Sequence, residues 1–111
     1  MSSKKKKALT VWKKLHGTNK FAKDFHGRLM ALEGYGNPNY FTFINSEKIY
    51  CGWNIHHIRP RSKGGSNEIE NLTCTNIATN QQASDKITYW IDGCKYQVRK
   101  CDKFYKIDRL V

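Results

Sequence analysis

The sequence predicts an α+β fold, and three features of its pattern support this class. Apolar residues between positions 10 and 32 recur in places at helical spacing, and a polar stretch over residues 75–86 suits a short helix. Two β-rich stretches cover residues 40–44 and 48–58, and the chain alternates around Asp92-Gly93, its strongest short-range hairpin signal. We therefore expect an N-terminal helical segment, a central region of strands with one helix, and a C-terminal β-hairpin.

The N-terminal part divides into a tail and a helical region. Residues 1–9 contain a run of lysines and are expected to form a flexible, solvated basic tail. Residues 17–19 interrupt the helical spacing that follows, so we expect two helices, with Thr18 or Asn19 capping the second. Residues 10–111 are expected to form a single domain, because 111 residues allow one modest core but not two.

The central region, residues 48–86, has the predicted order strand, long loop, short strand, helix. A hairpin-like turn over residues 45–47 precedes it, and Gly64-Gly65 indicates that the loop is irregular. Thr75 or Asn76 is expected near the start of the helix. Such a compact ββα arrangement is able to bring a strand side chain and a helix side chain together around one point.

Two of the four histidines, His56 and His57, are adjacent at the end of the first of these strands. Neighbouring side chains in a strand point to opposite faces, so we expect the two rings to have different roles. Taken alone, the pair is better explained as one buried and one exposed histidine without function. Its interpretation depends on the spacing to other residues.

The composition favours a polyanionic partner and an intracellular location. Lys and Arg number 20 against 9 Asp and Glu, which gives a net charge of +11; DNA, RNA or an anionic membrane are the usual partners of such a chain. No apolar run is long enough to span a membrane, and the basic start lacks the apolar region of a secretory signal. The four cysteines form no C-x-x-C pair, so we expect buried thiols, with a split four-cysteine zinc site as the alternative.

The stretch "GWNIHHIRPRSKGGSNEIENL", followed by "TCTNIATNQQASDK", resembles the HNH endonucleases, also called ββα-metal nucleases. His57 is followed after fourteen residues by Asn71 and after nine more by Asn80, which is similar to the H-N-N form of the family motif, including the proline and the glycine pair of the loop. The resemblance covers about 35 residues, with the motif core at 48–86. It implies a ββα-metal core and a metal-dependent endonuclease that hydrolyses phosphodiester bonds in DNA, with RNA as the second candidate.

The resemblance also implies a role for each motif residue. It assigns His57 to the activation of water, a task that suits imidazole because its ordinary pKa is ~6.5. His56 and Asn80 would bind one divalent metal ion, leaving positions open for phosphate oxygens and water. Asn71, with two donors and two acceptor lone pairs, would tie the loop together and fix the backbone at His57.

Two departures from the family pattern affect the metal and the phosphate contacts. Position 56 is more often Asp, and a neutral His/Asn pair makes Mn²⁺, Ni²⁺, Co²⁺ or Zn²⁺ as credible as Mg²⁺. The helix has neutral glutamines where related sequences often carry Arg or Lys. Contacts to the nucleic-acid backbone are therefore expected from four basic residues of the loop and helix end: Arg59, Arg61, Lys63 and Lys86.

The rival interpretation is a non-catalytic, basic nucleic-acid-binding module that keeps the HNH scaffold. The complete set of His57, Asn71 and Asn80 favours the enzyme, because a binding-only descendant is expected to have lost at least one of them. No reader domain is recognisable, which suggests low sequence specificity, nicking rather than double-strand cleavage, or a protein partner that supplies targeting. The compact form suggests a phage or bacterial source; the sequence does not decide the oligomeric state.

Overall fold

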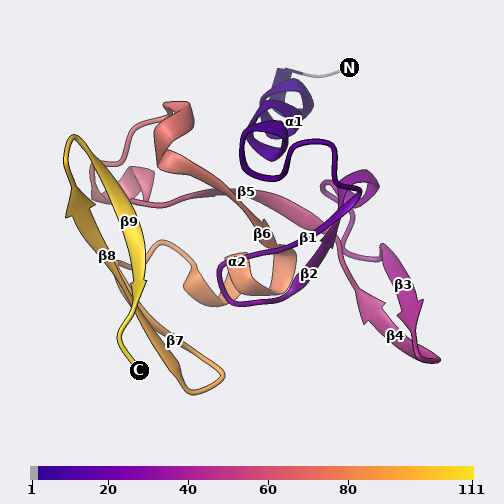
Figure 1. Cartoon of the computed structure of the whole chain (residues 1–111). Coiled ribbons are helices and arrows are strands. Elements are labelled where there is room, and N and C mark those ends of the chain that lie inside the picture. Colours follow the sequence, from indigo (N-terminus) through magenta and orange to yellow (C-terminus); the bar gives the residue numbers. More distant parts are fainter. Residues whose placement is uncertain (1–2) are drawn as a thin grey trace.

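The computed structural model describes residues 3–111, a mixed α/β arrangement of two helices and several small sheets (Figure 1). Three sheets are two-stranded, β1–β2, β3–β4 and β5–β6, and the fourth has the order β7–β8–β9; all strand pairs are antiparallel. Met1 and Ser2, the start of the predicted tail, lie outside the described residues. Within the described part of the chain, no helix is long and apolar enough to cross a membrane.

Helix α1, Ser3–His16, includes most of the residues that we expected in a flexible tail. Ala8, Val11 and Trp12 form one stripe at helical spacing, and all three are buried against the central strands. The described part of the expected tail is therefore helical, because burial of this stripe stabilises the helix despite its run of lysines. The chain leaves α1 at Gly17, whose φ of 61° suits a left-handed C-terminal residue.

The predicted second helix is absent from the described chain, and a short hairpin takes its place. Strands β1, Phe21–Lys23, and β2, Leu29–Ala31, pair around a turn in which the Asp24 carboxylate accepts hydrogen bonds from the backbone N–H groups of His26 and Arg28. The side-chain bonds of Asp24 favour a turn over a helix at this point. The apolar spacing was misleading because Phe21, 49% exposed, does not belong to a buried stripe.

The second β-rich stretch, residues 48–58, contains parts of two different sheets rather than one continuous strand. β3, Phe41–Ile44, and β4, Glu47–Tyr50, form the predicted hairpin, and Asn45 and Ser46 in its turn both have positive φ. The chain bends at Gly52, where a side chain would collide with the Asn37 carbonyl, and then continues as β5, Trp53–His57. Because of this bend, β5 belongs to a different sheet from β4.

β5 pairs with β6, Leu72–Asn76, and the chain passes directly into α2, Ile77–Ala83. The Asn76 side chain caps α2 by accepting the N–H of Ala78 at 2.9 Å, which confirms the expected helix start. Helix α1 packs on one face of the β5–β6 hairpin, where the rings of Trp12 and Trp53 lie 4.9 Å apart. Short 3-10 helices occur at Leu32–Gly34, Arg61–Lys63 and Ile69–Asn71.

The C-terminal residues form a three-stranded meander. β7, Thr88–Ile91, and β8, Cys94–Cys101, make the predicted hairpin at Asp92-Gly93, and β9, Phe104–Arg109, adds a third strand where the sequence was ambiguous. Its buried side chains form a second core with the end of α2, and the members of that core are Ala83, Tyr89, Ile91 and Tyr96.

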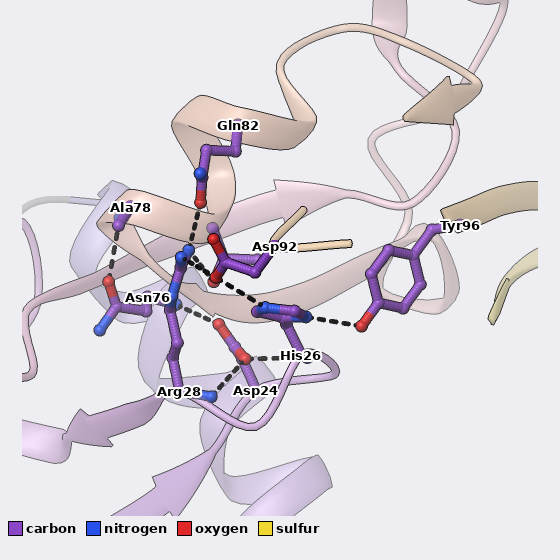
Figure 2. A network of polar contacts seen from close by, with 9 residues as sticks. Asp24, His26, Arg28, Asn76, Ala78, Gln82, Asp92 and Tyr96 are labelled. Atoms are coloured by element: carbon purple, nitrogen blue, oxygen red, sulfur yellow. Dashed lines mark hydrogen bonds and ion pairs between the residues drawn. The ribbon is translucent and has the colours of Figure 1, made fainter. Parts of the chain in front are cut away.

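A polar network joins the first hairpin, α2 and the C-terminal sheet (Figure 2). Asp24, 9% exposed, accepts the backbone N–H of Asn76 at the start of α2. Arg28 donates to Thr79 and Gln82 on α2 and pairs with Asp92 at 2.8 Å. These contacts fix where α2 begins and how it is oriented relative to β5.

Candidate active site

The β5–β6 hairpin presents His56 and His57 on opposite faces, as strand alternation predicts. His57 pairs with Leu72, which is buried against α1, so the His57 side chain lies on the α1 face. His56 pairs with Thr73 and lies on the face that α2 covers. The two rings therefore meet different groups.

His56 contacts Asn80 of α2 in a buried setting. The ring is 5% exposed, its Nδ1 lies 2.9 Å from Asn80 Oδ1, and the ring of Phe25 stacks beside it at 6.4 Å. Burial lowers the pKa of His56 from its ordinary 6.5, and the hydrogen bond to Asn80 opposes this only in part. The imidazole is therefore neutral at neutral pH, which is the form able to bind a metal ion.

His57 lies at the more open end of the strand. Its Nε2 is 3.0 Å from Oδ1 of Asn67 in the loop, and the Nζ of Lys7 donates to the carbonyl oxygen of the same Asn67 at 2.6 Å. A cavity of about 320 Å³ is bordered by His57, Asn67, Lys4 and Lys7 together with apolar residues. The N-terminal lysines thus lie beside one of the two histidines.

A second cavity, of about 400 Å³, is bordered by both histidines and Asn80. Arg61 and Asp85 also line it, so it contains groups of both charges. Because His57 is the last residue of β5, it borders this cavity as well as the one on the α1 face. The two histidines therefore share one opening although their rings lie on opposite faces.

Asn71 holds the loop between β5 and β6 at both ends. It is 2% exposed; its Oδ1 accepts the N–H of Arg59, and its Nδ2 donates to the carbonyl oxygens of Arg59 and Ser66. Its backbone carbonyl accepts the N–H of Ile58, the residue after His57. The expected tie across the loop is present, and it acts on the backbone just beyond His57.

A family model described as HNH endonuclease matches residues 45–85, which include β5, β6, α2 and every motif residue described above. Residues 45–85 thus carry an HNH endonuclease domain. No curated protein and no solved structure gives a significant match to the chain. The HNH domain indicates nuclease activity in general, and its match confirms the family expected from the spacing of His57, Asn71 and Asn80.

The basic residues predicted to contact nucleic acid lie in different settings. Arg61 is exposed and borders the shared cavity, whereas Lys63 and Lys86 are exposed but do not line it. The guanidinium of Arg59 stacks on the ring of Tyr105 at 4.7 Å, and its Nε donates to the Lys63 carbonyl oxygen at 2.6 Å. Arg59 thus contributes to holding the loop against β9.

The glycine pair in the loop of the HNH domain is required by the conformation and packing of the loop itself. Gly64 has a φ of 89°, and a side chain at Gly65 would collide with the carbonyl oxygen of Arg59. The close backbone approach at Gly65 occurs within the loop, because the chain folds back on the start of its own turn.

The four cysteines do not gather at a zinc site. Cys51 and Cys74 are buried, Cys94 is half-buried and Cys101 is exposed, and all four are free thiols. Between residues 3 and 111 no group of three or more His, Cys, Asp or Glu side chains is placed to hold a metal ion. The alternative of a split four-cysteine zinc site is therefore wrong for the described residues, and any ion at the HNH motif would rest on a His/Asn pair.

Sequence reasoning missed three residues that border the motif. Asn67 contacts His57 from ten positions further along the chain, and Lys7 reaches the same loop from sixty positions away. Asp85, next to the predicted Lys86, lines the shared cavity. A polar residue in a glycine-containing loop was the only local signal for Asn67, and the lysine run that contains Lys7 gives no indication of its contact with this loop.

Proposed function

We propose that the protein is a metal-dependent endonuclease that hydrolyses phosphodiester bonds in DNA, with β5, β6 and α2 as its ββα-metal core. The observation that carries the proposal is the contact between His56 Nδ1 and Asn80 Oδ1 at 2.9 Å, next to His57 in one cavity. A strand residue and a helix residue distant in sequence converge there, which a binding-only scaffold would not require. RNA is the second candidate substrate.

His56 and Asn80 fit a divalent ion. A neutral imidazole has one N–H and one lone pair, so Nδ1, 2.9 Å from Asn80 Oδ1, donates a hydrogen bond to that oxygen or, with the ring proton on Nε2, offers its lone pair to a cation beside it. When bound, a divalent ion polarises the scissile phosphate and stabilises the leaving oxygen. Mg²⁺ or Mn²⁺ is proposed, with Ni²⁺, Co²⁺ and Zn²⁺ as further candidates.

His57 is proposed to take the proton of the attacking water. The Asn67 amide oxygen accepts a hydrogen bond, so the partner nitrogen, Nε2, carries the ring proton in this arrangement. The other nitrogen, Nδ1, is then the basic one and is available to a water molecule. Asn71 supports this role from the loop by fixing the backbone just beyond His57.

The positive charge supports a nucleic-acid substrate. Lys4 and Lys7 border the cavity on the His57 side, and Arg61 borders the shared cavity, so cations lie on both sides of the proposed reacting centre. We propose that these groups, together with the exposed Lys63 and Lys86, hold phosphates of the backbone. A protein partner that supplies targeting and an intracellular location in a phage-infected or bacterial cell stay predictions.

Plasmid nicking tests the enzyme against its rival, a non-catalytic binding module. Supercoiled DNA is incubated with the wild type and with His57→Ala, in EDTA, Mg²⁺ or Mn²⁺, and the open-circular form is quantified. We expect nicking that depends on the added metal and falls by about 10²-fold or more in His57→Ala. Salt-sensitive gel shifts without cleavage in any of the metals would support the binding module instead.

A further inference from the structure

The β3–β4 hairpin carries three aromatic rings and a lysine on one face. Phe41 pairs with Tyr50 and Phe43 pairs with Lys48, so these four side chains point to the same side of the two-stranded sheet. We call them the aromatic face. The Phe41 ring packs edge-on against both Phe43 and Tyr50, with centroids 5.5 Å and 6.1 Å apart. The rings therefore form one continuous surface.

This surface is exposed to solvent. Phe41, Phe43 and Tyr50 are 42%, 62% and 53% exposed, and none of them belongs to either hydrophobic core. The hairpin projects from the body on the side away from the C-terminal sheet (Figure 1). Ile44, Glu47 and Ile49 of the opposite face line a cavity of about 510 Å³ beside Arg28, and Lys48 and Tyr50 border the same cavity from the aromatic face. Leaving three rings in water has an energetic cost that a ligand would remove.

The charge on the aromatic face points to a nucleic-acid ligand. The Lys48 ammonium lies 4.2 Å from the Phe41 centroid and 5.3 Å from the Tyr50 centroid. An apolar protein surface laid over the rings would bury this charge without a partner, which is costly. A nucleotide places its base on a ring and its phosphate on the ammonium, and the net charge of +11 favours the same partner.

The aromatic face is held firmly relative to the motif. Only two residues separate β4 from β5, and the side chain of Asn76, the cap of α2, donates to the Tyr50 carbonyl oxygen at 3.1 Å. A strand of nucleic acid that stacks on the rings is therefore positioned with respect to both the His56 strand and the Asn80 helix.

We propose that the aromatic face binds unpaired bases of the nucleic-acid substrate by stacking, so that the substrate has a single-stranded region next to the cleaved bond. Paired bases within a duplex are already stacked on their neighbours and do not expose their faces to the rings. The identification of these bases as part of a substrate rests on the proposed endonuclease function, whereas the binding itself does not.

Fluorescence anisotropy in EDTA tests the binding without cleavage. The ligands are labelled oligothymidine and the duplex that it forms with oligoadenine, and the proteins are wild type, Phe43→Ala, Tyr50→Ala and Ile44→Ala. Ile44, 48% exposed, lies on the opposite face of the same hairpin and is the matched control. Each aromatic variant is expected to weaken single-strand binding about tenfold. Duplex binding should change less than twofold, and Ile44→Ala should change neither.

Salt dependence and oligomeric state separate the other outcomes. Phe43→Ala should keep the wild-type salt slope of single-strand binding, while Lys48→Gln should reduce it by about 0.7. Equal losses for single strand and duplex, or no loss in either aromatic variant, would overturn the proposal. So would a dimer that Phe43→Ala abolishes while single-strand affinity is unchanged, because the occupant would then be a second copy of the chain. Absence of nicking in every metal alongside aromatic-dependent binding in EDTA would overturn the endonuclease alone.

Discussion

The two faces of the β5–β6 hairpin are built from one short ribbon, yet they differ in every property that matters for chemistry. On the α2 face, His56 is buried, neutral and in contact with a single amide. On the α1 face, His57 is half-buried and has an amide and two lysines nearby. A strand period of two is enough to place one histidine in a buried setting and its neighbour in a half-buried setting next to lysines, with no extra element.

The different roles proposed for the two adjacent histidines match this difference. A metal ligand benefits from burial, which keeps the ring neutral, whereas a base must exchange protons with water. The helices that cover the two faces differ accordingly. The short, polar α2 lies over the His56 face, and the lysine-rich α1 lies over the His57 face. If the two faces have separate functions, variants on each should separate binding of the ion from binding and cleavage of DNA.

The largest expected effect is the contrast between His57→Ala and Asn80→Ala. Both should reduce nicking by about 10²-fold or more, since each removes a group at the reacting centre. Only Asn80→Ala should weaken Mn²⁺ affinity, by at least about tenfold, because it removes one of the two proposed protein ligands. Isothermal titration with Mn²⁺ measures the second quantity. Equal losses of Mn²⁺ affinity in both variants would show that the faces are not independent.

A substitution on the α2 face should change which ion works. His56→Asp puts a hard, charged oxygen donor in place of imidazole nitrogen, and hard cations prefer oxygen. The ratio of the nicking rate in Mg²⁺ to that in Mn²⁺ is expected to rise severalfold over the wild type. His57→Asp is the matched control on the other face. An unchanged ratio in His56→Asp would count against His56 as a ligand.

Asn67 should tune His57 rather than act on DNA. Removal of its hydrogen bond in Asn67→Ala is expected to lower kcat by up to about tenfold, because one neutral hydrogen bond is worth about 1 kcal/mol. Asn67→Asp should instead move the acid limb of the pH–rate profile upward, because a carboxylate beside Nε2 favours the protonated ring. A purely structural Asn67 would leave the pH profile in place in both variants.

Lys7 should contribute a smaller, salt-dependent effect. Lys7→Gln removes a cation beside His57, so the slope of log affinity for duplex DNA against log salt should become shallower by about 0.9. Lys14→Gln, on the exposed last turn of α1, changes the net charge equally and is the matched control. The same loss of slope in both variants would mean that the helix attracts DNA without a defined phosphate contact.

The smallest expected effect concerns Cys74, which is buried on the α1 face of the β5–β6 hairpin. Burial raises the pKa of the Cys74 thiol to about 12 from its ordinary value near 9, so the thiol stays protonated at pH 8 and should not react with a disulfide reagent in the folded protein. A raised pKa of this kind stabilises the fold below pH 9, and the contribution is lost as pH rises toward 12. The melting temperature should therefore fall less steeply between pH 8 and pH 11 in Cys74→Ala than in the wild type.

Thiol counting provides the reference for that prediction. Exposed Cys101 should react first, and Cys101→Ser should remove the fast phase without changing the slow one. Fast labelling of Cys74 in the folded state would show that α1 does not stay packed on the strands.

The parts of the fold that were predictable are those encoded within a few residues. Asp92-Gly93 and the turn at Asn45-Ser46 specify their hairpins through backbone angles that few residues adopt. Asn76 marks the start of α2 because its own side chain makes the cap. The motif was recognisable for a similar reason, since His57, Asn71 and Asn80 belong to one continuous stretch.

The parts that were missed depend on partners far along the chain. Whether Phe21 belongs to a helix or a strand depends on burial, which apolar spacing alone does not reveal. Helix α1 extends to Ser3 because Ala8 packs on strands that come much later in the sequence. Lys7 reaches the loop of the motif only because that packing brings α1 alongside it.

The buried carboxylate of Asp24 has a consequence for how the HNH domain can be divided. Asp24 accepts the backbone N–H of Asn76, the residue that caps α2, and Trp12 packs on Trp53 at the start of β5. Asp24 and Trp12 both lie outside the matched segment 45–85. The motif can thus be recognised as a unit in sequence without being a unit in stability. A graft of residues 45–85 into another scaffold would need a carboxylate in the place of Asp24 and an indole in the place of Trp12. Without them, the helix that carries Asn80 would lose contacts that hold it in place.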